Sequence, residues 1–413
     1  PPSGQRRPGY DEVDKMLAAM NEIITFGMIS DAIRFKLDDP EIGLLQSGRI
    51  GISKSFFEEK LKPFTHANTL ADVEYYMENF DDMMDVTPTE SVSSDEIDAY
   101  YDRVDEAFIN DWGVSFTQIL GVIKSLLIFG AQRETSVVVI RKEDFINEFV
   151  AKSSMTETEL TNILKFITLR SRPAYLTAPD GYKNEDVFPW KYNREFSVIR
   201  RPIVEFVRDG ESYLIWGIRN AEVAGRQFNQ LFQNGRLKYG KENINQLLGE
   251  RNRELGDQFR KIVFEWLSAH PELKVWDFEV KIAPGGHLKA DKDYGDIDIL
   301  VLDLKTAIVY NIECKRTHQA KNIHEMKTEL DAYFGRDGQK KKIQKHIERD
   351  TWLAQHQQEL QRFIGFDKPI KIKSFLLTSE VVPVKYIAGA DSPLPLIAFP
   401  QLKSDGIKLL REL

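Results

Sequence analysis

The sequence has very little cysteine, because Cys314 is the only one among 413 residues. A single thiol excludes an internal disulfide framework and a cysteine-based zinc site, and it indicates a reducing compartment. Long apolar runs are missing too: the longest apolar patch, Ile119–Ala131, is interrupted by Lys124 and Ser125 and is too short for a membrane span. No signal peptide is visible, so we expect a cytoplasmic protein without membrane contact.

A complete phosphate-binding loop is also lacking, since Gly51-Ile52-Ser53-Lys54 misses the glycine spacing that such a loop needs. The chain is nevertheless long, and 413 residues with 42% hydrophobic content suffice for two or three domains with their own cores. It begins with Pro1 rather than Met, as expected for a trimmed product or a piece of a longer protein. We expect three domains, over residues 1–114, 115–240 and 241–413.

The net charge of −8 is unevenly distributed. Residues 71–112 hold fourteen Asp or Glu against one base, Arg103, which gives −13 and leaves +5 for the rest of the chain. This acidic part predicts either an ordinary solvated face or a surface that faces a partner or imitates nucleic acid.

A basic stretch follows later, because residues 315–349 hold ten Lys or Arg against five acids. Such a face suits a phosphate backbone, and the alternative is a solvated helix surface. The candidate nucleic-acid contacts are Arg316, Lys340, Lys341, Lys342, Lys345 and Arg349.

The first domain is expected to be mostly helical, because apolar residues at helix spacing begin at Tyr10 and the pattern extends to Leu61. In the acidic stretch, Thr87–Ser94 (TPTESVSS) predicts a loop. The residues that predict a packed helix around it are Tyr75, Tyr76, Met77, Phe80 and Met84. We assign contact with a protein partner, or with a second copy of the chain, to the N-terminal half.

The second domain shows a more informative order of elements. The pattern predicts a helix, a strand, two helices and a two-stranded hairpin, over Phe116–Phe129, Ser136–Ile140, Lys142–Lys152, Thr156–Leu169 and then Phe196–Val207 with Ser212–Ile218. The pair Thr156 and Glu159 forms a capping-box pattern, and Asp209-Gly210 is a hairpin signal. This order is that of a winged helix, so we expect a winged-helix-like domain that recognises DNA or protein, or regulates.

A short basic and aromatic segment, Lys191–Arg201 (KYNREFSVIRR), lies at the start of that hairpin. Such a mixture suits nucleic-acid backbones and stacked bases. It equally suits a strand whose long basic side chains cover an apolar face, and this second interpretation is the favoured one.

The third domain contains a stretch, Tyr294–Arg316, that predicts two short strands joined by a tight turn. Strict alternation places Asp296 and Asp298 on one face of the first strand, and Glu313 and Lys315 on one face of the second. Buried charges are costly unless they are paired or bind a metal. Two carboxylates at strand ends suit a hard ion such as Mg²⁺, and a lysine can steady an attacking water or a developing negative charge.

In these residues the sequence resembles the PD-(D/E)xK nuclease superfamily, which has the restriction-endonuclease-like fold. The signature there is an Asp near the end of one strand and E-x-K on the next, and here it stands as Gly295-Asp296-Ile297-Asp298 followed by Glu313-Cys314-Lys315. The resemblance covers residues 245–379. It implies an α/β/α core with a mixed sheet, a catalytic set of Asp298, Glu313 and Lys315, and binding of Mg²⁺ or Mn²⁺ by Asp298, Glu313 and the flanking Asp296.

The resemblance also implies a further acid on an opening helix, which the pattern places over Gln246–Ala269. The candidates are Glu254, Asp257 and Glu265. Glu254 and Asp257 are favoured as metal ligands because they lie three residues apart on one helix face. The sequence departs from the family here, since Arg260 stands where the family has a glutamate, and the choice of helix acid stays open.

The remaining pattern completes the expected core. It predicts a first sheet strand, two helices, a further strand and an irregular proline-rich tail, over Lys274–Ile282, Asn322–Gly335, Gln339–Phe363, Lys371–Thr378 and the residues after them. We therefore expect an α+β protein, with a mostly helical N-terminal half and a C-terminal restriction-endonuclease-like core.

Two functions remain open from the sequence. In the first, the protein is a Mg²⁺-dependent phosphodiesterase, expected to be an endonuclease on DNA and a regulated effector in phage defence or repair. In the second, the nuclease fold is catalytically silent and serves to bind or assemble nucleic acid or protein. The intact set of Asp298, Glu313 and Lys315 favours the first.

Overall fold

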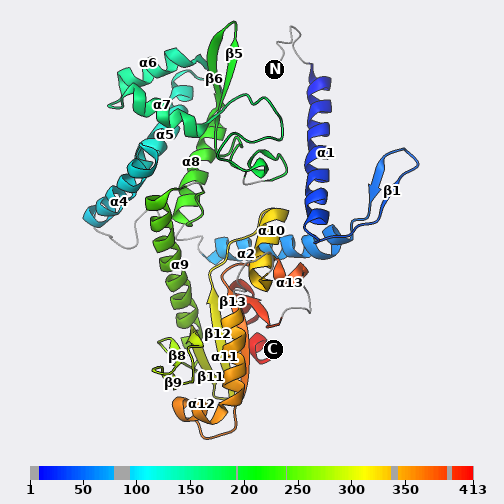
Figure 1. Cartoon of the computed structure of the whole chain (residues 1–413), viewed down its shortest axis with the longest axis vertical. Helices are drawn as coiled ribbons and strands as arrows, with labels where there is room; N and C mark the ends of the chain where they lie inside the picture. Colours follow the sequence, from blue (N-terminus) through cyan, green and yellow to red (C-terminus); the bar gives the residue numbers. More distant parts are fainter. Residues whose placement is uncertain are drawn as a thin grey trace. The chain divides into compact units, whose positions relative to one another are not determined.

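The computed structural model describes residues 9–78, 94–191, 194–238, 240–335, 343–387 and 393–412 (Figure 1). It confirms a mixed α+β protein whose N-terminal half is mainly helical and whose C-terminal half is built on a sheet. The chain divides into two compact units. Unit 1 comprises Pro1–Gly27 and Pro88–Glu254, and unit 2 comprises Met28–Thr87 and Leu255–Leu413.

The N-terminal segment is less helical than its apolar spacing predicts. Helix α1 (Tyr10–Arg34) is followed by the hairpin of β1 (Ile42–Leu44) and β2 (Ile50–Ile52), the π-helical turn η1 (Phe56–Leu61) and helix α2 (Lys62–Glu78). The predicted helix is therefore wrong between Arg34 and Phe56, and the chain is helical again over Phe56–Leu61. Pro40 has no backbone N–H to continue it, and Gly48 adopts a φ of 74° in the hairpin turn.

Helix α1 is rich in apolar residues, although it has no long uninterrupted apolar run. Among the described residues it is the one single helix long and apolar enough to cross a membrane, and helices α4 (Ser94–Trp112) and α5 (Phe116–Gln132) pass only as a pair bent by 89°. Core helices and N-terminal leader sequences meet the same criterion, so the finding does not assign α1 to a membrane.

The acidic part of the chain is described in two pieces. Tyr75, Tyr76 and Met77 lie in helix α2, but Met77 is exposed and does not pack as predicted. Phe80, Met84 and the predicted loop up to Ser93 lie outside the described residues. Helix α4 (Ser94–Trp112) follows. It buries Val104 and Phe108 in the core of unit 1, so this acidic helix packs.

Unit 1 contains the order of elements predicted for a winged helix. Helix α5 (Phe116–Gln132), strand β3 (Val137–Arg141), helices α6 (Lys142–Lys152) and α7 (Glu157–Ile167), and the hairpin of β5 (Ile203–Arg208) and β6 (Glu211–Gly217) follow one another. Strand β6 pairs antiparallel with both β3 and β5, and the short β4 (Thr168–Leu169) pairs parallel with β5. The hairpin thus lies beside β3 in one four-stranded sheet.

Local sequence signals in this module are reproduced at most positions. Thr156 Oγ1 accepts a hydrogen bond from the Glu159 backbone N–H (3.3 Å), and the Thr156 N–H donates to Glu159 Oε2 (2.8 Å), which completes the predicted capping box. The hairpin turns at Asp209-Gly210 with φ of 53° and 81°. The first hairpin strand was predicted from Phe196 but begins at Ile203, because turns occupy the segment before it.

Unit 2 is a three-layer arrangement around a mixed five-stranded sheet (Figure 1). The strand order is β14-β13-β12-β11-β7, over Leu396–Ala398, Lys371–Thr378, Ile308–Lys315, Ile299–Asp303 and Leu273–Val275. Strands β12 and β13 run parallel, and β11 is antiparallel to β12.

Helices cover both faces of this sheet. The unit 2 part of α9 (Glu242–Ser268) packs Phe259, Val263 and Leu267 on one face. Helices α11 (Gln344–Gln355) and α12 (Gln357–Ile364) pack Trp352 and Leu360 on the other. All five residues of β11 are buried, which explains why its sequence is a continuous apolar run up to Asp303.

Two predicted strands of unit 2 are interrupted. The strand predicted over Lys274–Ile282 ends at Val275, and β8 (Val280–Ala283) pairs instead with β9 (Leu288–Lys289) and β10 (Gly295–Ile297) in a separate sheet. The motif strand is split as well, because Asp298 forms a bend between β10 and β11. Ile297 therefore packs in the same core cluster as Leu300, so strict alternation through Asp298 is wrong.

The tail is more regular than its prolines predict. Strand β14 adds an edge to the sheet parallel to β13, and Pro400 lies in the first turn of α14 (Phe399–Asp405), where its missing N–H is tolerated. Helix α10 (Ile323–Phe334) and strand β13 form where predicted. The predicted helix Gln339–Phe363 is split at His356 into α11 and α12, and its first four residues lie outside the described part. The remaining elements are η2 (Asn184–Val187), α8 (Ile218–Gln233), α13 (Val384–Ile387) and α15 (Lys408–Glu412).

Candidate functional site

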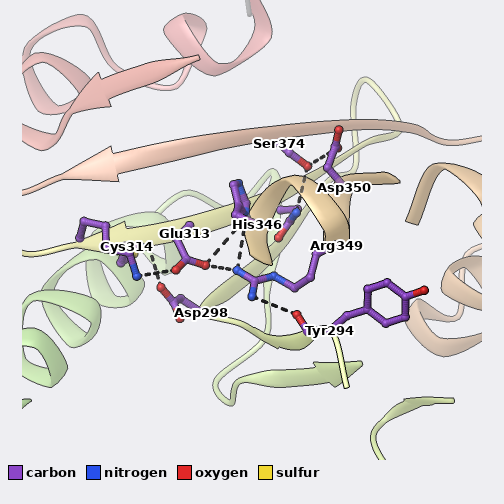
Figure 2. Close-up of polar contacts among 10 residues, drawn as sticks. Tyr294, Asp298, Glu313, Cys314, His346, Arg349, Asp350 and Ser374 are labelled. Atoms are coloured by element: carbon purple, nitrogen blue, oxygen red, sulfur yellow. Dashed lines mark hydrogen bonds and ion pairs between the residues drawn. The ribbon is translucent and has the colours of Figure 1, made fainter. Parts of the chain in front are cut away.

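The bend at Asp298 directs its carboxylate toward the end of the neighbouring strand β12 (Figure 2). Asp298 Oδ2 accepts a hydrogen bond from the backbone N–H of Cys314 (2.7 Å). Burial and the negative charge of Glu313 raise the pKa of Asp298 to about 6, against the opposing effects of Lys315 and of this hydrogen bond. Cys314 packs in the core, and burial raises its pKa well above the ordinary value, so its thiol is no nucleophile.

Glu313 is the centre of the charge cluster. It lies on β12 and is 8% exposed. Its Oε1 accepts from the ammonium of Lys315, and its Oε2 accepts from the guanidinium of Arg349. Burial alone would raise the pKa of Glu313, but the charges of Arg349 and Lys315 hold it below the ordinary value. The carboxylate is therefore ionised and fixed in place.

Helix α11 supplies two residues of this cluster that the sequence interpretation did not assign to it. Arg349, 3% exposed, also donates from Nη1 to the carbonyl oxygen of Tyr294 (3.4 Å). His346 Nδ1 lies 3.8 Å from Glu313 Oε2, and burial lowers its pKa to about 4, so the ring is neutral at pH 7. One sequence signal could have found both, because His346 and Arg349 are three residues apart on the helix face that carries Leu353 into the core.

The backbone conformation and the nearby Arg349 explain why position 295 of the motif is a glycine. Gly295 adopts a φ of 85°, and a Cβ there would lie 3.1 Å from Arg349 Nη1. A larger residue would therefore be strained and would crowd the guanidinium that holds Glu313.

A second polar chain supports the same face of the sheet (Figure 2). Asn311, two residues before Glu313, donates from Nδ2 to Ser374 Oγ (2.9 Å), and that hydroxyl donates to Asp350 Oδ1 (2.5 Å). Helix α11 is thus held to β12 through Arg349 and to β13 through Asp350.

A pocket of about 350 Å³ opens beside Asp298 and brings one helix acid to the site. Its wall includes Asp257, Arg260 and Lys261 from α9, together with Asp298. Glu254 is not among the residues that line it, and its carboxylate pairs with Arg251 (3.1 Å).

The other two acids named from the sequence lie apart from that pocket wall. Glu265 is exposed and pairs with Lys261 (3.8 Å). Asp296 is half-buried on β10, opposite Lys281 of β8.

The predicted basic face is only partly described. Lys340, Lys341 and Lys342 lie outside the described residues, and Lys345 is exposed on α11. Arg349 differs from the expectation of a solvent-facing contact, because it is buried against Glu313. Arg316 is half-buried, with Nη1 3.2 Å from His318 Nε2.

The carboxylates of Asp298 and Glu313 are the kind of ligand that a hard cation prefers, although they are only two. Within the described ranges, no three His, Cys, Asp or Glu side chains are grouped closely enough to hold a metal ion. Asp298 and Glu313 do lie close enough for one charge to raise the pKa of the other carboxyl. A cation between them would relieve this repulsion, and Mg²⁺ commonly takes one or two carboxylates and completes its shell with water and phosphate oxygens.

A family model described as "Anti-phage protein Upx-like" matches residues 10–391, well over half of the chain. No curated protein and no solved structure matches the chain.

Proposed function

Because the chain belongs to the Upx-like family of anti-phage proteins, we propose that it acts in phage defence as a metal-dependent nuclease of the PD-(D/E)xK type, with DNA as its substrate. The family supports the defence role. The observation that carries the nuclease proposal is the convergence of Asp298, Glu313 and Lys315 at the adjacent ends of the inner strands β11 and β12, in a sheet that helices cover on both faces.

Each residue of the site has a role in this proposal. Asp298 and Glu313 would hold Mg²⁺ or Mn²⁺, and Asp257 lies on the pocket wall as the third candidate ligand. The bound ion would polarise the scissile phosphate and help to generate hydroxide. The side chain of Lys315 is 37% exposed, so its ammonium can reach both Glu313 and a solvent-side water or phosphate oxygen. Arg349 is a positioning residue that fixes Glu313.

The substrate and location are part of the proposal. Lys345 on α11 and the half-buried Arg316 are proposed to contact the phosphate backbone, as are Lys340 to Lys342. DNA injected by a phage is met in the cytoplasm, which agrees with a chain that has one cysteine. The N-terminal half is proposed to contact a partner or a second copy.

One observation favours the alternative, a catalytically silent module that binds nucleic acid or protein. Both oxygens of Glu313 already accept from cationic side chains. A carboxylate engaged in this way can serve structure alone.

The test is cleavage of a mixed panel by the purified chain. Linear, circular, single-stranded and branched DNA, with matching RNA, are incubated with Mg²⁺ or Mn²⁺ and, in parallel, with a chelator. We expect metal-dependent cleavage of DNA that the chelator abolishes. Binding of DNA without cleavage under every metal condition would support the silent module instead.

A further inference from the structure

Unit 1 contains a cavity of its own, of about 290 Å³, which is separate from the carboxylate site. One wall is aromatic: Trp112 stacks on Phe166 with ring centroids 4.7 Å apart and planes at 17°. Phe228, also on the wall, stacks on Phe116 with centroids 5.2 Å apart. Flat apolar surfaces of this kind suit a planar ring.

The charged part of the cavity wall is cationic and centres on Arg200. Its side chain is 9% exposed and donates from Nη1 to Glu195 Oε2 (2.6 Å). Its Nε is buried and has no partner within the described part of the chain. Glu195 also accepts from Arg201 Nη2 (3.3 Å), so two guanidinium groups share one carboxylate. The positive charge here is not fully neutralised.

The rest of the lining adds to this excess. Among the wall residues that the structure describes, the second acid is Asp111, whose two oxygens accept from Asn243 Nδ2 (2.8 Å) and from the Ile244 N–H (2.9 Å). Two acids therefore face three bases, because Lys241 lies on the wall and Arg201 shares Glu195 with Arg200. An anionic group is the complementary charge.

The segment Lys191–Arg201 contributes Glu195 and Arg200 to the wall of this cavity. Its residues 195–200 form bends and turns instead of the favoured strand, and Arg201 stacks over the Phe196 ring with its guanidinium carbon 4.3 Å from the centroid. Its bases are turned inward, since Lys191 is 6% exposed and pairs with Glu185 (2.8 Å). The segment thus builds a wall and not an open nucleic-acid track.

We propose that this cavity binds a small planar anion, one aromatic ring system that carries a single phosphate, of the size of a nucleoside monophosphate. The ring lies against the aromatic wall of Trp112, Phe166 and Phe228, and the phosphate faces Arg200 and Lys241. The volume of about 290 Å³ supports this size, since ligand pockets begin at roughly 300 Å³ and larger ligands need more. The site goes beyond the proposed nuclease activity and does not depend on it.

Isothermal titration calorimetry of the full chain tests this site. The probes are AMP, GMP, CMP and UMP, each compared with its nucleoside and with inorganic phosphate. We expect at least one monophosphate to bind at least tenfold more tightly than both its nucleoside and phosphate alone. If no monophosphate binds, or if the nucleoside binds equally well, the proposal is wrong.

Three variants locate the binding. Arg200→Gln is expected to weaken the preferred monophosphate at least tenfold, and its folding is checked by thermal melting. Lys241→Gln changes an exposed side chain on the same wall and is expected to weaken binding several-fold even if Arg200→Gln fails to fold. Arg219→Gln, an exposed residue of α8 outside the wall, is the control and keeps wild-type affinity. Wild-type affinity of Lys241→Gln would place the ligand elsewhere and overturn the assignment.

Discussion

Replacement of Arg349 by methionine is expected to lower the free energy of unfolding by about 3–5 kcal/mol. Arg349 and Glu313 are both buried and pair directly, so the variant leaves a buried carboxylate without its main partner. Lys315 is more exposed and compensates only in part. Urea denaturation at pH 8 measures the loss, which should shrink at low pH because the unpaired Glu313 then takes up a proton.

Two controls separate this pair from a general effect of losing an arginine. Arg362→Met removes an exposed arginine of α12 and is expected to change stability by no more than about 0.5 kcal/mol. The double variant Arg349→Met with Glu313→Gln should recover most of the loss, since no charge is then buried unpaired. Equal losses for Arg349→Met and Arg362→Met would show that the buried pair does not form.

Asp298→Asn is expected to separate activity from stability. DNA cleavage should fall by more than about 100-fold, because loss of a group that only supports a metal ligand already costs about 10–100-fold. The fold should be kept, since the asparagine oxygen can still accept from the Cys314 N–H, and the variant should be at least as stable as wild type at pH 8.

The pH dependence follows from the pKa of Asp298. Its value of about 6 lies above the ordinary 3.8, so Asp298 stabilises the fold fully only below about pH 4 and loses this contribution as the pH rises through 6. With a chelator present, the free energy of unfolding of Asp298→Asn should therefore rise relative to that of wild type by up to about 3 kcal/mol as the pH increases from 4 to 7. Asp277→Asn, an exposed acid of the same pocket, is the control without such a gain. A pH-independent difference would contradict the burial of Asp298 beside Glu313.

Local signals in the sequence predicted the elements that depend on neighbouring residues. The capping box at Thr156, the turn at Asp209-Gly210 and the bounds of β13 depend on backbone preferences over a few positions, and the structure confirms them. The motif pattern likewise selected Asp298, Glu313 and Lys315, and the structure brings these three together.

Features that depend on contacts distant in sequence were missed. Arg349 follows three lysines and Lys345, so composition alone predicts a solvent-facing base, whereas packing of α11 against β12 turns it toward Glu313, 36 residues away. The bend at Asp298 arises because β10 pairs with β8 while β11 pairs with β12 and β7. The cavity of unit 1 combines walls from Asp111 to Lys241, which no local pattern connects.

The catalytic role of Lys315 is tested by single-turnover DNA cleavage with Mg²⁺ by wild type, Lys315→Ala and Lys371→Ala. Lys371 is exposed on the neighbouring strand at the opposite end of the sheet, since Ile308 pairs with Lys371 and Lys315 with Thr378. We expect Lys315→Ala to slow cleavage about 100-fold or more with DNA affinity nearly unchanged, and Lys371→Ala to cleave at the wild-type rate. Equal rates for all three proteins, or cleavage that persists with a chelator, would contradict it.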